Sequence, residues 1–176
     1  MRSRRAARRH RRARVSRLDS LIRRLQAQRA CLVHAARLIG GVPGPIFEIG
    51  LGNGRTYDHL RALCPAREIF VFERRAPDEP GLGPGGRHLV LGDIRETVPA
   101  AASAAAARPA LVHSDIGSGD SAGNARLAAA LAGFLPGLLA PGGIALSDLA
   151  LPGAGDWALP PPAGVAAGRY FLYRRP

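Results

Sequence analysis

The chain has 176 residues, of which 47% are hydrophobic, and this is enough for one domain with its own core. Its formal charge is +12, and all 25 basic residues are arginine. Eight of these arginines lie between Arg2 and Arg14, and without them the formal charge would be +4. The rest of the chain is only mildly basic, so charge alone does not identify a nucleic-acid-binding protein.

Cysteine spacing and hydropathy argue against several other classes. Cys31 and Cys64 have no CxxC spacing, so we expect two reduced thiols rather than a metal or redox centre. The uncharged run 127–147 contains Pro136 and Pro141, which would interrupt a membrane-spanning helix. No apolar segment follows the first arginines, and this disfavours a secretory signal. We therefore expect a cytoplasmic protein without membrane contact.

Residues 1–15 form an arginine-rich segment without apolar periodicity, which predicts a disordered tail. Val15 can be encoded by an alternative start codon, so we hypothesise that natural translation begins there and that the tail is not native. A single domain then covers residues 16–176. Its first element is a helix over 16–39, in which Ser16 and Asp19 form a capping box ahead of apolar residues at helical spacing.

Short apolar runs alternate with helical stretches along the rest of the domain. The expected strands cover 46–49, 69–72, 88–91, 110–114, 144–147, 157–159 and 169–174. The expected helices between them cover 56–63, 96–107 and 124–139. This βαβ repetition predicts an α/β fold with a mostly parallel sheet and helices on both faces.

A glycine-rich loop follows the first expected strand and reads Glu48-Ile49-Gly50-Leu51-Gly52-Asn53-Gly54. Three glycines allow a sharp turn and a close approach of the backbone to a ligand, although plain βα turns can also be glycine-rich. The loop is G-x-G-x-G rather than the G-x-G-x-x-G of dinucleotide sites. Glu48 would repel a pyrophosphate but suits a cationic ligand such as S-adenosylmethionine, which carries a sulfonium and an ammonium group.

Ligands of open α/β sheets bind beyond the carboxyl ends of the strands, where three further residues lie. Glu73 ends the second strand at the distance expected for an acceptor of ribose hydroxyls, and it could equally be a polar strand end. Asp93 and Ile94 follow the third strand and suit an adenine ring, Asp93 through the exocyclic amine. Alternatively, Asp93 simply caps the next helix.

Asp115 follows the fourth strand and is the candidate catalytic residue, close to the methionine moiety or the methyl acceptor. It could instead cap or brace the next helix. His34 is a second candidate base, although a helical histidine more often has a structural role. Asp115, Asp120 and Asp148 lack a recognised ligand spacing, so we expect no metal.

The strand-end signals, in this order, resemble the motifs of class I S-adenosylmethionine-dependent methyltransferases. The blocks SRLDSLIRRLQAQRACL, GPIFEIGLGNGRTYDHLR, EIFVFERR, LGDIRET and GRYFLYRR are similar to a small bacterial family of short methyltransferases. The resemblance implies a Rossmann-like, seven-stranded sheet in the order 3-2-1-4-5-7-6 with the last strand antiparallel. It places Gly50, Gly52 and Gly54 at the methionine end, with further contacts from Asn53, Thr56 and Tyr57.

These patterns predict a methyltransferase that uses S-adenosyl-L-methionine and acts on a small-molecule acceptor. Two alternatives stay open: an RNA methyltransferase anchored by the arginine tail, and a non-catalytic protein that binds S-adenosylmethionine or S-adenosylhomocysteine. Only residues 148–156 separate the fifth and sixth strands, and there is no appended substrate domain. We therefore expect the N-terminal helix, or a second subunit in a homo-oligomer, to complete the acceptor pocket.

Overall fold

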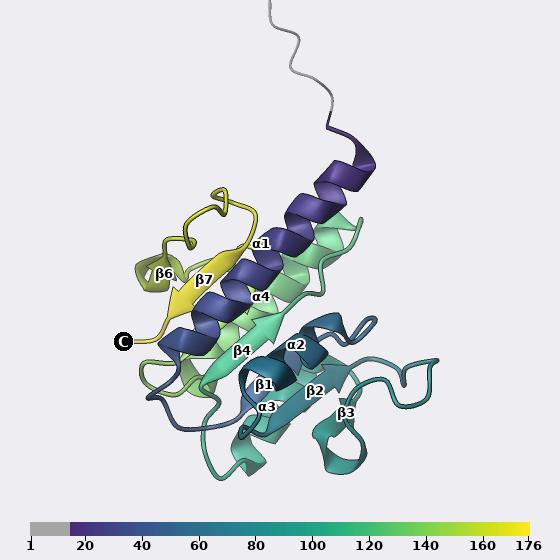
Figure 1. Cartoon of the computed structure of the whole chain (residues 1–176). Helices are drawn as coiled ribbons and strands as arrows, with labels where there is room; N and C mark the ends of the chain where they lie inside the picture. Colours follow the sequence, from purple (N-terminus) through teal and green to yellow (C-terminus); the bar gives the residue numbers. More distant parts are fainter. Residues whose placement is uncertain (1–14) are drawn as a thin grey trace, which may run out of the picture.

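The computed structural model describes residues 15–176, which form a central sheet with helices on both faces (Figure 1). Its seven strands lie in the order β3-β2-β1-β4-β5-β7-β6, as the resemblance implied. Strands β1 to β5 pair in parallel, whereas β7 is antiparallel to both β5 and β6. The strands are β1 (Ile46–Ile49), β2 (Ile69–Glu73), β3 (Leu89–Leu91), β4 (Leu111–Ser114), β5 (Ile144–Ser147), β6 (Ala158–Leu159) and β7 (Phe171–Arg174).

Two hydrophobic clusters fill the space between the sheet and its two helical layers. Helices α1 (Arg17–Leu38) and α2 (Arg55–Leu63) cover one face, and α3 (Ile94–Ala104) and α4 (Ser121–Leu138) cover the other. Successive side chains of a strand point to opposite faces, so Ile46 packs under α1 and α2 while Phe47 packs under α3 and α4. By the same alternation, the polar residues Glu48 and His113 belong to the face covered by α1 and α2.

Side-chain caps set where the helices begin. Ser16 accepts a hydrogen bond from the Asp19 backbone N–H at 3.0 Å, so the predicted start of the first helix is confirmed. Asp93 and Asp120 cap α3 and α4, which therefore begin two or three residues earlier than the predicted 96 and 124. Short 3₁₀ turns at Gly86–His88 and Gly155–Trp157 replace the first residues of two predicted strands.

The first half of α1 differs from the amphipathic expectation. Its apolar residues Leu18, Leu21 and Ile22 are exposed, and burial begins only at Ala27. Figure 1 shows the reason, since the first turns of α1 extend past the carboxyl ends of the parallel strands. Apart from Val15, the predicted tail 1–15 lies outside the described residues. Over 15–176, no helix has both the length and the apolar character needed to cross a membrane.

Candidate active site

The glycine-rich loop turns from the carboxyl end of β1 into α2, and its glycines adopt backbone angles that other residues avoid. Gly50 has φ = 88° and donates its N–H to Phe72 O at 2.8 Å, which fastens the loop to β2. A Cβ at Gly50 would lie 2.6 Å from Cγ2 of Ile116. Gly52 has φ = 50°, but a Cβ there would meet nothing within 4 Å. The loop is therefore packed at Gly50 and open at Gly52, where a ligand can approach the backbone.

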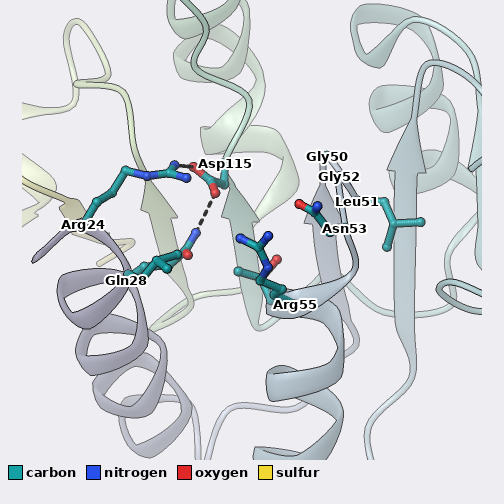
Figure 2. Close-up of a pocket in the computed structure, with 10 residues that line it drawn as sticks. Arg24, Gln28, Gly50, Leu51, Gly52, Asn53, Arg55 and Asp115 are labelled. Atoms are coloured by element: carbon teal, nitrogen blue, oxygen red, sulfur yellow. Dashed lines mark hydrogen bonds and ion pairs between the residues drawn. The ribbon is translucent and has the colours of Figure 1, made fainter. Parts of the chain in front are cut away.

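A pocket lies beside this loop and is formed by three segments that are distant in the sequence (Figure 2). Helix α1 contributes one wall, the glycine loop and the start of α2 a second, and the end of β4 a third. The structure brings five of the predicted site residues together here, namely Gly50, Gly52, Asn53, Thr56 and Asp115. Arg24, Leu25, Gln28, Leu51 and Arg55 complete the lining.

Asp115 is the acidic group of this pocket, and two α1 side chains bind it. Gln28 Nε2 donates to Asp115 Oδ2 at 2.6 Å, and Arg24 approaches Asp115 Oδ1 at 3.3 Å. The Asp115 side chain is 20% exposed and that of Arg24 is 46% exposed. Helix α1 therefore lines this pocket, and its part in completing an acceptor pocket stays a prediction.

Behind the pocket, a chain of hydrogen bonds runs through the interior of the protein. Glu48 is fully buried, and its oxygens bind the Thr56 hydroxyl and, at 2.6 Å, Nδ1 of His113. His113 Nε2 lies 2.7 Å from the Tyr170 hydroxyl, which also accepts from Gln28 Nε2 at 3.3 Å. This series of hydrogen bonds therefore links the pocket to the centre of the sheet.

Burial and charge act in opposite directions on His113. Burial lowers its pKa, but the Glu48 carboxylate beside Nδ1 outweighs burial with help from Asp115 and Asp148, so the pKa lies above its ordinary value. Burial also raises the pKa of the Tyr170 hydroxyl well above its ordinary range, and the nearby Asp115 adds to that rise. Both effects favour the protonated form of these two buried groups.

Glu48 itself exposes no atom to the pocket, since both oxygens are bound to Thr56 and His113. Its predicted role as a cofactor contact stays a prediction. In this conformation its influence on a ligand would pass through Thr56, which lines the pocket.

Glu73 lies under the glycine loop at the end of β2. Its Oε2 accepts from the Leu51 N–H at 2.8 Å and more weakly from Gly52 at 3.4 Å, while Oε1 accepts from Arg74 at 2.7 Å. The carboxylate therefore stands beside the open part of the loop, where each oxygen retains a further lone pair. Its binding of ribose hydroxyls stays a prediction.

Other predicted site residues lie outside the pocket lining. Asp93 caps α3 and binds the Arg95 side chain, and this hydrogen bond, with a second from the Arg95 backbone, lowers the pKa of Asp93 to about 2. Ile94 is buried and Tyr57 packs against the core under α1 and α2. The capping alternative for Asp93 is thus present, and adenine recognition by Asp93 and Ile94 stays a prediction. Gly54 has φ = 71° and begins α2 rather than lining the pocket.

The remaining acidic candidates have structural partners. Asp120 caps α4, and Asp148 Oδ2 accepts from the Gly117 N–H at 2.9 Å. Oδ1 of Asp148 is buried without a hydrogen-bond partner among the described residues. His34, the second candidate base, does not line the pocket around Asp115.

Sequence reasoning missed Arg24, Gln28, Arg55, His113 and Tyr170. One signal was present, because Gln28 interrupts an apolar stripe in which Leu25 and Leu32 are neighbours at helical spacing. A polar residue in such a stripe needs a buried partner. His113 was a second signal, as an ionisable residue that directly follows the apolar residues Leu111 and Val112 of the same strand.

The comparisons with known proteins agree with this geometry. A family model described as S-adenosyl-L-methionine methyltransferase matches residues 15–175. The chain belongs to this family. A solved S-adenosyl-L-methionine methyl transferase from Silicibacter pomeroyi is 44% identical, with a TM-score of 0.82 over 92% of this chain and 99% of that one. No functionally curated protein matches the chain.

A TDP-rhamnose 3′-O-methyltransferase of calicheamicin biosynthesis is also similar to the chain in structure. It is 21% identical, with a TM-score of 0.59 over 91% of this chain and 81% of that one, and the likeness shows the shared class I methyltransferase fold. Taken together, the family match and the fold identify an S-adenosyl-L-methionine-dependent methyltransferase.

The residues around the pocket fit that cofactor. The open side of Gly52 leaves room for a ligand against the backbone, and Asp115 offers negative charge toward a cationic group. Glu73 stands beside the same loop with a carboxylate that has lone pairs left for a ligand. A methyltransferase cofactor with an ammonium, a sulfonium and a ribose calls for this donor and acceptor set.

Proposed function

We propose that this methyltransferase transfers a methyl group to a small-molecule acceptor held between α1 and the glycine loop. The observation that carries the proposal is the position of Asp115, which lies beside the loop while Gln28 of α1 fixes one of its oxygens. The pocket walls come from one short domain, so they suit a compact acceptor. The same fold serves the TDP-rhamnose 3′-O-methyltransferase, so it accommodates an acceptor of that size.

When bound, S-adenosyl-L-methionine supplies an electrophilic methyl group on a positively charged sulfur. Asp115 then has two roles, as the anionic group facing the cofactor's cationic end and as the acceptor of the proton that the nucleophile releases. A nucleophile of the acceptor held beside Asp115 would take up the methyl group that the cofactor supplies, and Asp115 would accept the proton that this nucleophile releases. Most of the rate gain then comes from alignment of donor and acceptor.

Polar side chains on both sides of Asp115 would orient the acceptor. Figure 2 shows Arg24 and Gln28 on the α1 side, with Asn53 and Arg55 on the side of the glycine loop. Arg24 is half-exposed and makes only a 3.3 Å contact with Asp115, so it is free to move when a substrate enters. Two guanidinium groups also provide donors for hydroxyl or anionic groups of the acceptor.

Calorimetric titration of the full chain with S-adenosyl-L-methionine tests the cofactor contacts. We expect Glu73→Ala to weaken binding at least about tenfold, because it removes a charged acceptor worth about 1.5–3 kcal/mol. Glu68→Ala is a matched control, since Glu68 binds only the surface residues Arg87 and His88. Unchanged binding by Glu73→Ala would refute the ribose contact.

A second experiment separates the acceptor classes. The full chain is incubated with methyl-labelled S-adenosyl-L-methionine and either the small-molecule fraction or the RNA fraction of a bacterial extract. We expect label in the small-molecule fraction and its loss with Asp115→Asn. Label confined to RNA would overturn the small-molecule proposal, and label in neither fraction would favour a binding protein without turnover.

A further inference from the structure

Three buried polar side chains have no direct part in the proposed methyl transfer. Glu48 and His113 are fully buried in adjacent central strands, where they are paired in register, and Tyr170 is 2% exposed just before β7. Burying such groups is costly, and an apolar set of similar volume often gives equal or greater stability. Stability alone therefore does not account for these three polar groups, whereas their hydrogen-bonded connection to the pocket could.

The connection depends on the orientation of the Gln28 amide. Its Nε2 carries two N–H donors, one directed at Asp115 Oδ2 at 2.6 Å and the other at the Tyr170 hydroxyl oxygen at 3.3 Å. If the amide were flipped, its carbonyl oxygen would face the Asp115 carboxylate, which is repulsive. The Asp115 carboxylate therefore sets the orientation of the amide, and the Tyr170 hydroxyl oxygen holds the amide in place by accepting its second N–H.

The hydroxyl of Tyr170 is itself held in place from behind. It lies 2.7 Å from His113 Nε2, and the opposite ring nitrogen of His113 lies 2.6 Å from Glu48 Oε2. The Tyr170 and His113 rings also stack, with centroids 6.0 Å apart. Each group in the series thus fixes the next, from β1 through β4 and the segment before β7 to α1.

Asp115 is the last group of this series. Among the five groups of the series, Gln28 and Asp115 line the pocket on the described part of the chain. Gln28 holds Oδ2, whereas Oδ1 has only the long contact to the half-exposed Arg24. One carboxylate oxygen is therefore fixed from the interior and the other is available to a ligand.

We propose that Tyr170 and His113, anchored by Glu48, are positioning residues that fix Gln28 in place and thereby hold Asp115 against the cationic end of the bound cofactor. The inference rests on the proposed function in one respect, which is that Asp115 faces S-adenosyl-L-methionine. It adds that the cofactor's affinity depends on a tyrosine hydroxyl that never touches the cofactor.

The test measures binding of S-adenosyl-L-methionine and S-adenosylhomocysteine to the full chain by calorimetry. Tyr170→Phe removes the hydroxyl and keeps the ring, and we expect it to weaken binding of both ligands about tenfold. Tyr173→Phe is the matched control, because its buried hydroxyl accepts from the Leu151 N–H on the other face of the sheet. We expect Tyr173→Phe to lower the thermal midpoint while leaving both affinities unchanged.

A double-mutant cycle then shows whether Tyr170 acts through Asp115. In the Asp115→Asn background, Tyr170→Phe should weaken binding less than about twofold, because the carboxylate it helps to hold is gone. A purely structural role would give the same loss in both backgrounds. If Tyr170→Phe does not fold, Gln28→Met replaces it in the cycle, since it removes the amide donor that links Tyr170 to Asp115.

The outcomes separate the two proposals. Failure of the unaltered chain to bind either ligand would refute the proposed cofactor site itself. Normal binding with a Tyr170→Phe affinity equal to that of Tyr173→Phe would overturn the positioning role alone. An equal loss in both Asp115 backgrounds would overturn it as well.

Discussion

Replacing Glu48 tests how strongly the buried hydrogen-bond chain stabilises the domain. In Glu48→Leu, the N–H at Nδ1 of His113 and the hydroxyl of Thr56 lose their acceptor in a fully buried place. Each orphaned donor costs about 1–3 kcal/mol, and breaking a buried pair costs about 3–5 kcal/mol, so we expect a loss in that second range. For a domain of this size the thermal midpoint should fall by about 6–20 °C.

Glu48→Gln is the informative comparison because its amide oxygen still accepts from His113 and its amide nitrogen can donate to Thr56. We expect it to cost only about 1 kcal/mol. The assay is urea unfolding of both variants at equal protein concentration. A cost below about 1 kcal/mol for Glu48→Leu, or equal costs for the two variants, would refute the reasoning.

The unaltered chain and Glu48→Gln should also differ in how their stability depends on pH. In the unaltered chain Glu48 raises the pKa of His113 despite burial, so this group binds its proton more tightly in the folded than in the unfolded state. Its contribution to stability is complete below the unfolded pKa of about 6.5 and is lost as the pH rises through the higher folded value. In Glu48→Gln the carboxylate is gone and burial dominates, so this decline of stability with rising pH should disappear. If the free energy of unfolding depended on pH in the same way in both proteins, Glu48 would not be the cause of the raised His113 pKa.

Three other substitutions test the geometry around the site. Gly50→Ala should lower the free energy of unfolding in urea more than Gly52→Ala does, because a Cβ at Gly50 would meet Ile116 at 2.6 Å while one at Gly52 would meet nothing within 4 Å. Gly52→Ala should instead mainly weaken cofactor binding, measured by calorimetry. Asp148→Asn should raise the thermal midpoint at neutral pH, since burial, with Asp115, raises the pKa of this carboxyl and its Oδ1 lacks a partner among the described residues. The gain should shrink as the pH falls through the raised folded pKa and vanish below about pH 3, where the carboxyl is protonated in both the folded and the unfolded state, and a constant gain at all pH values would exclude this cause.

The fold was predictable because its signals are local and repeated. Each parallel strand is a short apolar run followed by turn residues, and the strands found lie within the predicted ranges apart from Glu73, which joins the end of β2. The errors lie at the boundaries, where Asp93 and Asp120 begin helices earlier than hydrophobic periodicity indicates. A capping carboxylate and a ligand-binding carboxylate look the same in a sequence, so these positions carried two interpretations.

The candidate site was only half predictable, for a different reason. Gly50, Gly52 and Asp115 follow strands whose carboxyl ends meet at one edge of a parallel sheet, so their proximity follows from the strand order. The contribution of α1 does not follow from that order, because it depends on how the helix crosses the sheet and which turn reaches the pocket. Gln28 could be placed against Asp115 only once that crossing was known.

The buried chain of hydrogen bonds shows how the sheet positions one wall of the pocket. Glu48 and His113 lie opposite each other in β1 and β4, so the sheet itself fixes the first link without any loop. Tyr170 carries the link to α1, whose first turns extend past the carboxyl ends of the parallel strands (Figure 1) and whose Arg24, Leu25 and Gln28 line the pocket. A helix held only by apolar packing could slide along the sheet, whereas the directional bonds to Gln28 define one position. The polar core thus ties α1 to the wall of the pocket through two directional hydrogen bonds.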